Sequence, residues 1–164
     1  MGLSSDDDSL KQHLVYLLCK LMSEDRQDLV DSFLDQNVFQ PLVSSMLHTN
    51  YMFRFYLAKL CAILFKNNLR ARQEFIKEHG VRMMVGQMNL TTLRGLEFRK
   101  RLEYMLLLIT DNDGNPIPEH VSTVSNEINK NTMGRIEVKK FSENDSETFD
   151  RFIEVLISCK QGNK

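Results

Sequence analysis

The residues of this chain that could do chemistry are few, and their spacing brings no catalytic set together. Its four histidines stand far apart on different predicted elements, and no two have the separation of zinc ligands. We interpret each as a surface or boundary histidine; they are His13, His48, His79 and His120.

Asp111, Asp113 and Asn115 resemble the first ligands of a calcium loop. The resemblance ends at Pro116, which stands where the loop needs glycine, and at Ser122, which stands where it needs a bidentate glutamate. The chain also has no glycine-rich phosphate loop, no nucleophile elbow and no His-Glu-x-x-His helix. We therefore predict a protein that is not an enzyme and that uses no metal or cofactor.

A basic cluster is the strongest candidate for a binding function. It comprises Arg94, Arg99, Lys100 and Arg101, and Arg54 precedes Arg99 by 45 residues. On two stacked helices, Arg54 and Arg99 would form a basic ladder with a step of roughly 8–10 Å. Guanidinium groups suit carboxylates and phosphates. A solvated helix face that offsets neighbouring glutamates is an interpretation of at least equal weight.

The charge of the whole chain is −1, but it is unevenly distributed. Residues 1–50 carry −5, residues 51–110 carry +7 and residues 111–164 carry −3. The basic middle could attract an acidic partner, and it could equally pair with the chain's own acidic ends. Nucleic acid is a weaker option, because the interleaved aromatic residues and glycines of such binders are missing.

Internal repetition shows which elements must position these residues. A shift of 42 residues superposes Cys19 on Cys61 and Phe33 on Phe75, and a further step of 45 residues continues the match. Within each copy the apolar residues lie three or four apart, the spacing of one helix face. Helical repeats near this length form α-solenoids, in which each unit shields the apolar face of its neighbour.

Composition and spacing divide the chain into four segments. Residues 1–8 are small and acidic, and we expect them to be disordered. Residues 9–112 form the repeat domain; within it, the helix that follows Asn50 is apolar on most sides and must lie between two neighbours. Residues 113–145 are a short helix and a loop. Residues 146–160 form an amphipathic helix that packs on the stack and caps it.

The cysteines and the absence of export signals bear on the compartment. Cys19 and Cys61 occupy equivalent apolar positions, which favours burial as small hydrophobic residues. With Cys159 they form no Cys-x-x-Cys pair and no disulfide framework. No signal peptide and no membrane-spanning run is present. We expect a protein of the cytoplasm, or of the nucleus, without membrane insertion.

Residues 72–88 look like a junction between armadillo-repeat helices. One helix ends in an apolar pair, a glycine in the left-handed conformation makes the turn, and a second helix begins on valine with its own core pair. These places hold Phe75 and Ile76, Gly80, Val81, and Met84 with Val85. The resemblance to the armadillo family covers roughly residues 10–112. It departs at His79, which replaces the first glycine of the family's pair, and at Val38, which stands where Gly80 would be.

The resemblance implies a concave surface made by the third helix of each repeat. Members that grip extended peptides place tryptophan and asparagine there; these two places hold Tyr16 and Lys20, Ala58 and Ala62, and Glu103 and Leu107. Because the asparagine is absent from all three, an extended nuclear-import-type peptide is not expected. The predicted partner-binding residues are Tyr16, Lys20, Arg54, Ala58, Ala62, Arg99, Glu103 and Leu107.

We therefore predict an all-α fold, a right-handed α-solenoid of about three armadillo-like repeats with a C-terminal capping helix. The expected function is that of a non-enzymatic adaptor or scaffold that presents this surface to a helix or a short acidic segment of a protein partner. Two copies could also pair through the ends of the stack. Alternatives are a co-chaperone or regulatory module acting on a partner ATPase, and nucleic-acid binding through the basic middle.

Overall fold

A computed structural model describes residues 7–22, 26–87, 95–130 and 146–161. In these residues the structure is helical apart from turns and one isolated bridge between Thr110 and Pro116. The helices are α1 (Asp8–Met22), α2 (Gln27–Leu34), α3 (Phe39–Ser44), a 3₁₀ turn (Ser45–Leu47), α4 (Tyr51–Phe65), α5 (Leu69–Lys77), α6 (Gly80–Gln87), α7 (Gly95–Ile109), α8 (Pro118–Lys130) and α10 (Ser146–Gln161).

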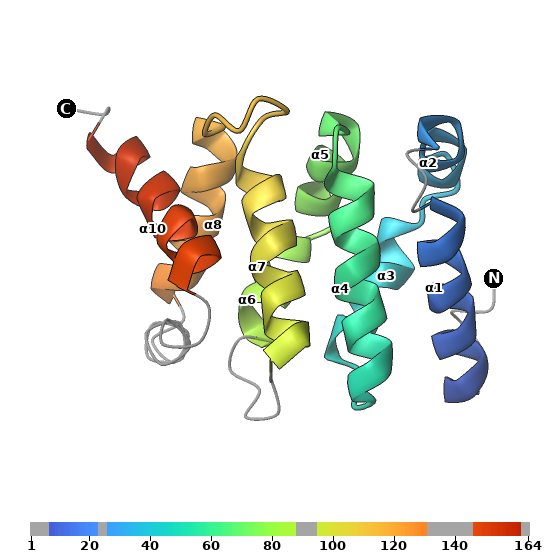
Figure 1. The fold of residues 1–164 in the computed structure, drawn as a ribbon. Helices are drawn as coiled ribbons and strands as arrows, with labels where there is room; N and C mark the ends of the chain where they lie inside the picture. Colours follow the sequence, from blue (N-terminus) through green and yellow to red (C-terminus); the bar gives the residue numbers. More distant parts are fainter. Residues whose placement is uncertain (1–6, 23–25, 88–94, 131–145, 162–164) are drawn as a thin grey trace.

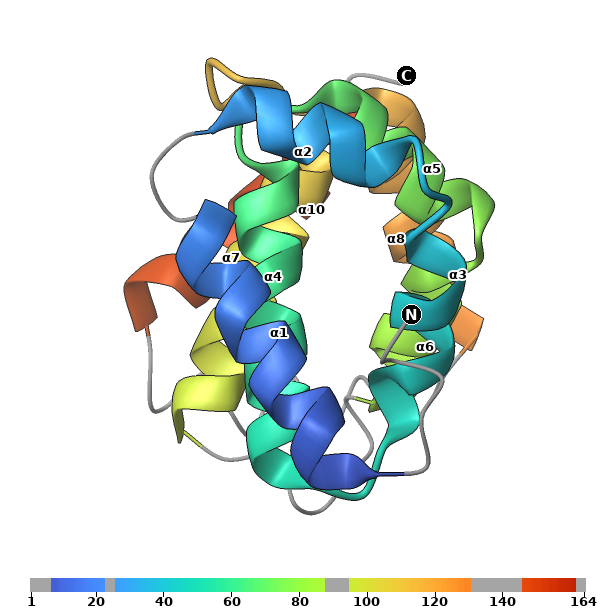
Figure 2. The ribbon, with the colours of Figure 1, turned by 90° about the vertical axis from the view of Figure 1, so that its right-hand side faces the viewer.

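The helices stack in one direction, as the repeated sequence predicts. Helices α1, α4, α7 and α10 lie side by side in one layer, with the shorter helices behind them (Figure 1). Viewed along the stack, α1, α4 and α7 form one wall, α2 and α5 close the top, and α3, α6 and α8 form the opposite wall (Figure 2). The predicted all-α solenoid is confirmed.

Helix α4 is the centre of the stack, because it packs between α1 and α7. Its inner positions Phe53, Leu57, Leu60 and Leu64 are each no more than 2% exposed. The Asn50 side chain accepts the N–H of Phe53 and so satisfies one of the free donors of the first turn. A helix this apolar is stable in water only between two neighbours.

The turn between the first and second helices of a unit, α2 and α3 or α5 and α6, differs in detail from the prediction. The left-handed residue is His79 (φ 62°), and its counterpart 42 residues earlier is Asn37 (φ 51°). Gly80 instead begins α6. A Cβ atom on Gly80 would lie 2.5 Å from the Phe75 ring. The glycine is needed for close packing, while asparagine and histidine tolerate the left-handed conformation.

A buried arginine joins the ends of two neighbouring third helices. Arg72 of α5 is 1% exposed, and its Nε donates to the carbonyl oxygen of Phe65 at 2.9 Å. Its Nη1 donates to the carbonyl oxygen of Thr110, and its Nη2 donates to Oδ1 of Asn112 at 3.0 Å. One guanidinium group thus satisfies carbonyls at the ends of both α4 and α7.

The two ends of the chain depart in part from the predicted segments. Residues 1–6 lie outside the described residues, but the expected disorder does not extend to Asp7, which precedes α1, or to Asp8, where α1 begins. The Asp7 carboxylate accepts the N–H of Ser9 at 2.9 Å. Helix α8 (Pro118–Lys130) is longer than the predicted short helix, and residues 131–145 lie outside the described part. Helix α10 packs on α7 and α8, as expected of a cap.

Candidate protein-binding groove

A groove of about 970 Å³ runs over the layer of third helices. Helices α4 and α7 form most of its floor, and α1, α2 and the first turn of α10 reach its edges. Ala62, Ile63, Leu106 and Leu107 line the floor with aliphatic side chains. The remaining lining residues are Met22, Arg26, Gln27, Val30, Lys59, Lys66, Asn67, Lys100, Glu103 and Thr148.

The polar lining of the groove is predominantly basic. Arg26, Lys59, Lys66 and Lys100 carry positive charge, against the single carboxylate of Glu103. Lys100 pairs with Glu103 one helical turn away, and Arg26 pairs with Asp28 outside the groove at 2.8 Å. The excess of positive charge over an apolar floor favours a ligand that is both apolar and acidic.

Three of the eight predicted partner-binding residues line the groove, and two more are exposed on α1. Ala62, Glu103 and Leu107 line the groove, although Ala62 is only 5% exposed. Tyr16 and Lys20 are exposed on α1, where the Lys20 ammonium lies 5.7 Å from the centre of the Tyr16 ring. The Tyr16 and Tyr56 rings in turn meet edge to face, with 5.3 Å between the ring centres.

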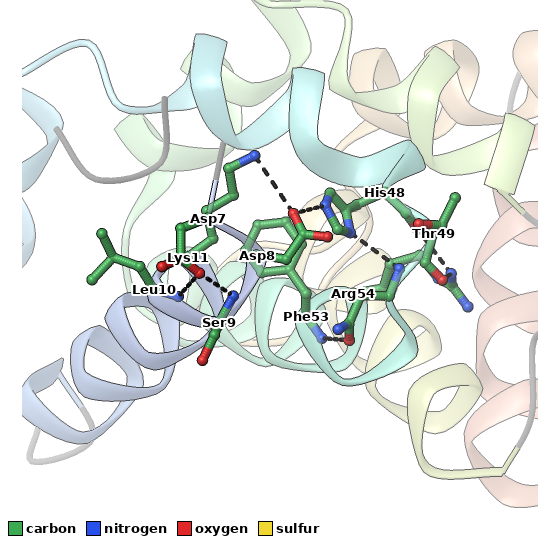
Figure 3. A network of polar contacts seen from close by, with 10 residues as sticks. Asp7, Asp8, Ser9, Leu10, Lys11, His48, Thr49, Phe53 and Arg54 are labelled. Atoms are coloured by element: carbon green, nitrogen blue, oxygen red, sulfur yellow. Dashed lines mark hydrogen bonds and ion pairs between the residues drawn. The ribbon is translucent and has the colours of Figure 1, made fainter. Parts of the chain in front are cut away.

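The predicted ladder of arginines is not present. Arg54 is 4% exposed, and its Nη1 donates to the carbonyl oxygens of His48 and Thr49 at 2.9 and 2.8 Å (Figure 3). It stabilises the loop before α4 and offers no surface to a partner. Ala58 is also buried, at 3% exposure. The side chain of Arg99 lies outside the described part of the chain.

The reason for this error is a shift of one residue in the repeat alignment. Helices α4 and α7 begin and end 44 residues apart, not 45. At a step of 44, Leu57 corresponds to Arg101 and Leu60 to Tyr104, and all four side chains are buried. The same step places Lys59 opposite Glu103, both of which line the groove.

Sequence analysis did not identify Lys59, Ile63 and Lys66 as groove residues. Their signal was nevertheless present: they lie three or four residues apart on the one side of α4 that is not wholly apolar. Lys59 also lies close to the buried thiol of Cys19. Burial raises the pKa of this thiol to about 11, and the positive charge of Lys59 opposes the rise.

The other polar groups of the described residues form local structural contacts. The Nε2 of His48 lies 2.9 Å from Oδ1 of Asp8 and joins the start of α1 to the loop before α4 (Figure 3). The Nδ1 of His120 bonds the carbonyl oxygen of Leu108 at 2.8 Å. Among the side chains that the structure describes, no three of the histidine, cysteine, aspartate and glutamate type are placed to hold a metal ion.

Comparison with proteins of known structure places the fold. An engineered protein superposes with a TM-score of 0.73 at 15% identity, over 97% of this chain and 65% of its own. The armadillo repeats only protein of Plasmodium falciparum superposes with a TM-score of 0.74 at 19% identity, over 94% of this chain and 64% of its own. This chain has an armadillo-like fold.

The armadillo-like fold is the extent of what these similarities show. No protein-family model and no curated protein sequence matches the chain. The chain spans about two thirds of the length of the two solved structures, 65% and 64% respectively. Within the described residues, none of the helices has the length and apolar character needed to cross a membrane.

Proposed function

We propose that this protein is a non-enzymatic scaffold that binds a short acidic helix of a partner protein in the groove between α4 and α7. The observation that carries the proposal is the combination of an aliphatic floor with a basic edge. The floor is made by Ile63, Leu106 and Leu107, and the edge by Lys59, Lys66 and Lys100. Apolar contact supplies affinity, while the lysines set the charge and the direction of the ligand.

The spacing of the lysines favours a helical ligand. Lys59 lies on α4 and Lys66 directly follows its last residue, and the seven residues between them correspond to about 10.5 Å along the helix axis. A partner helix that runs along α4 presents residues seven apart on one face at the same separation. Two acidic residues at this spacing, with leucines between them, therefore match the edge and the floor together.

A designed peptide tests the proposal directly. The probe is a fluorescent amphipathic helical peptide with glutamates seven residues apart and leucines on the same face. We expect saturable binding by anisotropy, and we expect the double substitution Lys59→Glu and Lys66→Glu to weaken it by about tenfold or more. Lys77→Glu is the matched control, because Lys77 lies on α5, outside the groove, with 73% of its side chain exposed.

A second peptide separates specific recognition from simple charge attraction. Its glutamates are replaced by lysines, and it should bind the doubly substituted protein better than the unaltered one. If neither peptide binds, or if Lys77→Glu weakens binding as strongly as the groove substitutions, the groove is not the site. A duplex oligonucleotide that displaces the acidic peptide with steep salt dependence would favour nucleic-acid binding instead.

A further inference from the structure

A stripe of leucines on α1 has no covering element in the described structure. Leu10, Leu17 and Leu21 are 45%, 53% and 62% exposed, and Leu14 between them is half-buried. Their spacing of four, three and four residues places them on one side of the helix. Among the described helices, α1 is the end member of its layer, and Figure 2 looks onto this end of the stack.

The stripe occupies the side of α1 that would receive another helix. Helices α1 and α4 both contain 15 residues, and aligning their ends superposes the stripe on buried residues of α4. On the opposite side of α1, Val15 and Cys19 are buried toward α4, and the Cys19 thiol donates to the carbonyl oxygen of Tyr56. In order along the stripe, the superposed α4 residues are Phe53, Leu57, Leu60 and Leu64, each no more than 2% exposed.

The other end of the stack has the opposite character. The outer positions of α10 are charged, with Glu147, Asp150, Arg151 and Glu154 exposed to solvent. Joining the leucine stripe of one copy to α10 of another would bury these charges against apolar side chains, at a high desolvation cost. Stacking of copies from head to tail is therefore disfavoured, and a symmetric contact between two stripes is favoured.

The stripe is complementary to itself when two copies of α1 run in opposite directions. The four, three, four spacing reads the same from either end, so Leu10 meets Leu21 of a second copy and Leu14 meets its Leu17. An antiparallel pair sets the N-terminus of each α1 beside the C-terminus of the other, so that the helix dipoles attract, whereas a parallel pair sets like ends side by side. Asp8 takes no part in this contact, because its carboxylate pairs with Lys11 and His48 of its own chain.

We propose that two copies of this chain associate through α1, packed antiparallel about a two-fold axis between Leu14 and Leu17. The surface is separate from the groove, and the proposal does not depend on a ligand there. The contact is limited to the width of one helix. Helix α2 at the same end of the stack does not extend it, because α2 exposes polar side chains such as Asp28, Asp31 and Asp35. A contact made by a single pair of helices is small for a protein interface, so we expect a weak and reversible dimer.

Sedimentation equilibrium of the full chain tests the proposal. We expect a concentration-dependent dimer that Leu17→Glu weakens roughly 100-fold, because each dimer then places two carboxylates in the apolar seam. Leu17 is largely exposed, so the substitution should not alter the helical circular dichroism or the melting curve. Ile157→Glu is the matched control, because Ile157 is similarly exposed, at 49%, on α10.

Disulfide trapping tests the orientation. Chains carrying Leu10→Cys are mixed with chains carrying Leu21→Cys and oxidised with copper phenanthroline. We expect cross-linked dimers in the mixture, and much less with Leu10→Cys alone. A chain that stays monomeric at all concentrations overturns the proposal. A dimer that Ile157→Glu breaks and Leu17→Glu does not, or efficient cross-linking of Leu10→Cys to itself, also overturns it.

Discussion

Replacing Arg72 should destabilise this fold more than replacing any exposed arginine. Its guanidinium group is buried and donates to Phe65, Thr110 and Asn112. Arg72→Met keeps most of the aliphatic stem but removes all three hydrogen bonds. A hydrogen bond from a charged donor contributes about 1.5 kcal/mol or more, and buried acceptors left without donors cost further free energy. We expect a loss of about 4 kcal/mol in the free energy of unfolding.

The matched control lies two residues earlier on the same helix. Arg70 forms an ion pair with Asp35 at 2.7 Å, but both side chains are more than half exposed. Exposed pairs contribute about 0–1 kcal/mol, so Arg70→Met should change stability little. The comparison isolates the buried hydrogen bonds from the loss of one positive charge.

Urea denaturation followed by circular dichroism measures both variants. The midpoint should fall strongly for Arg72→Met and hardly at all for Arg70→Met, with unchanged slopes. A loss below about 1 kcal/mol for Arg72→Met would refute the reasoning, because it would mean that the freed carbonyls find other donors or water. Equal losses for the two variants would refute it as well, since burial would then make no difference.

Two further predictions concern close packing and the buried thiols. Gly80→Ala should lower the free energy of unfolding, measured by urea denaturation, by about 1–3 kcal/mol, because the new Cβ would overlap the Phe75 ring. Gly86→Ala should leave stability unchanged or raise it slightly, since nothing lies within 4 Å of that position. Cys19 and Cys61 should react with a thiol reagent only after unfolding, because burial raises their pKa values from 9.0 to about 11 and about 12. As the pH rises, the thiols of the unfolded chain lose their protons before those of the folded chain. The contribution of the two buried thiols to the free energy of unfolding should therefore be constant below pH 9 and decline as the pH rises toward 11. A free energy of unfolding that stays unchanged over this interval would contradict the raised pKa values.

Sequence analysis correctly predicted the stacked helical units, because the spacing of apolar residues along one helix is enough to identify its buried face. The matched cysteines Cys19 and Cys61 and the apolar character of α4 indicated stacked helical units, and both thiols are buried. Local turn chemistry was harder to predict, because two positions compete for one role. The left-handed residue is His79 and not Gly80, since the glycine is required by the Phe75 ring, which is a tertiary contact.

The sequence by itself determined the kind of protein: an all-α stack whose units shield one another, since apolar spacing reports helix faces without any knowledge of their neighbours. Only the tertiary structure decided which residues remain open to a partner. A helix that packs against neighbours on both sides has only a narrow strip of solvent-accessible side chains. Because successive residues are rotated by about 100° about the helix axis, a shift of one residue moves a side chain out of this strip. An alignment error of one residue therefore assigned Arg54 to the surface, while the stacking of α1, α4 and α7 buries Arg54 and leaves Lys59 in the groove.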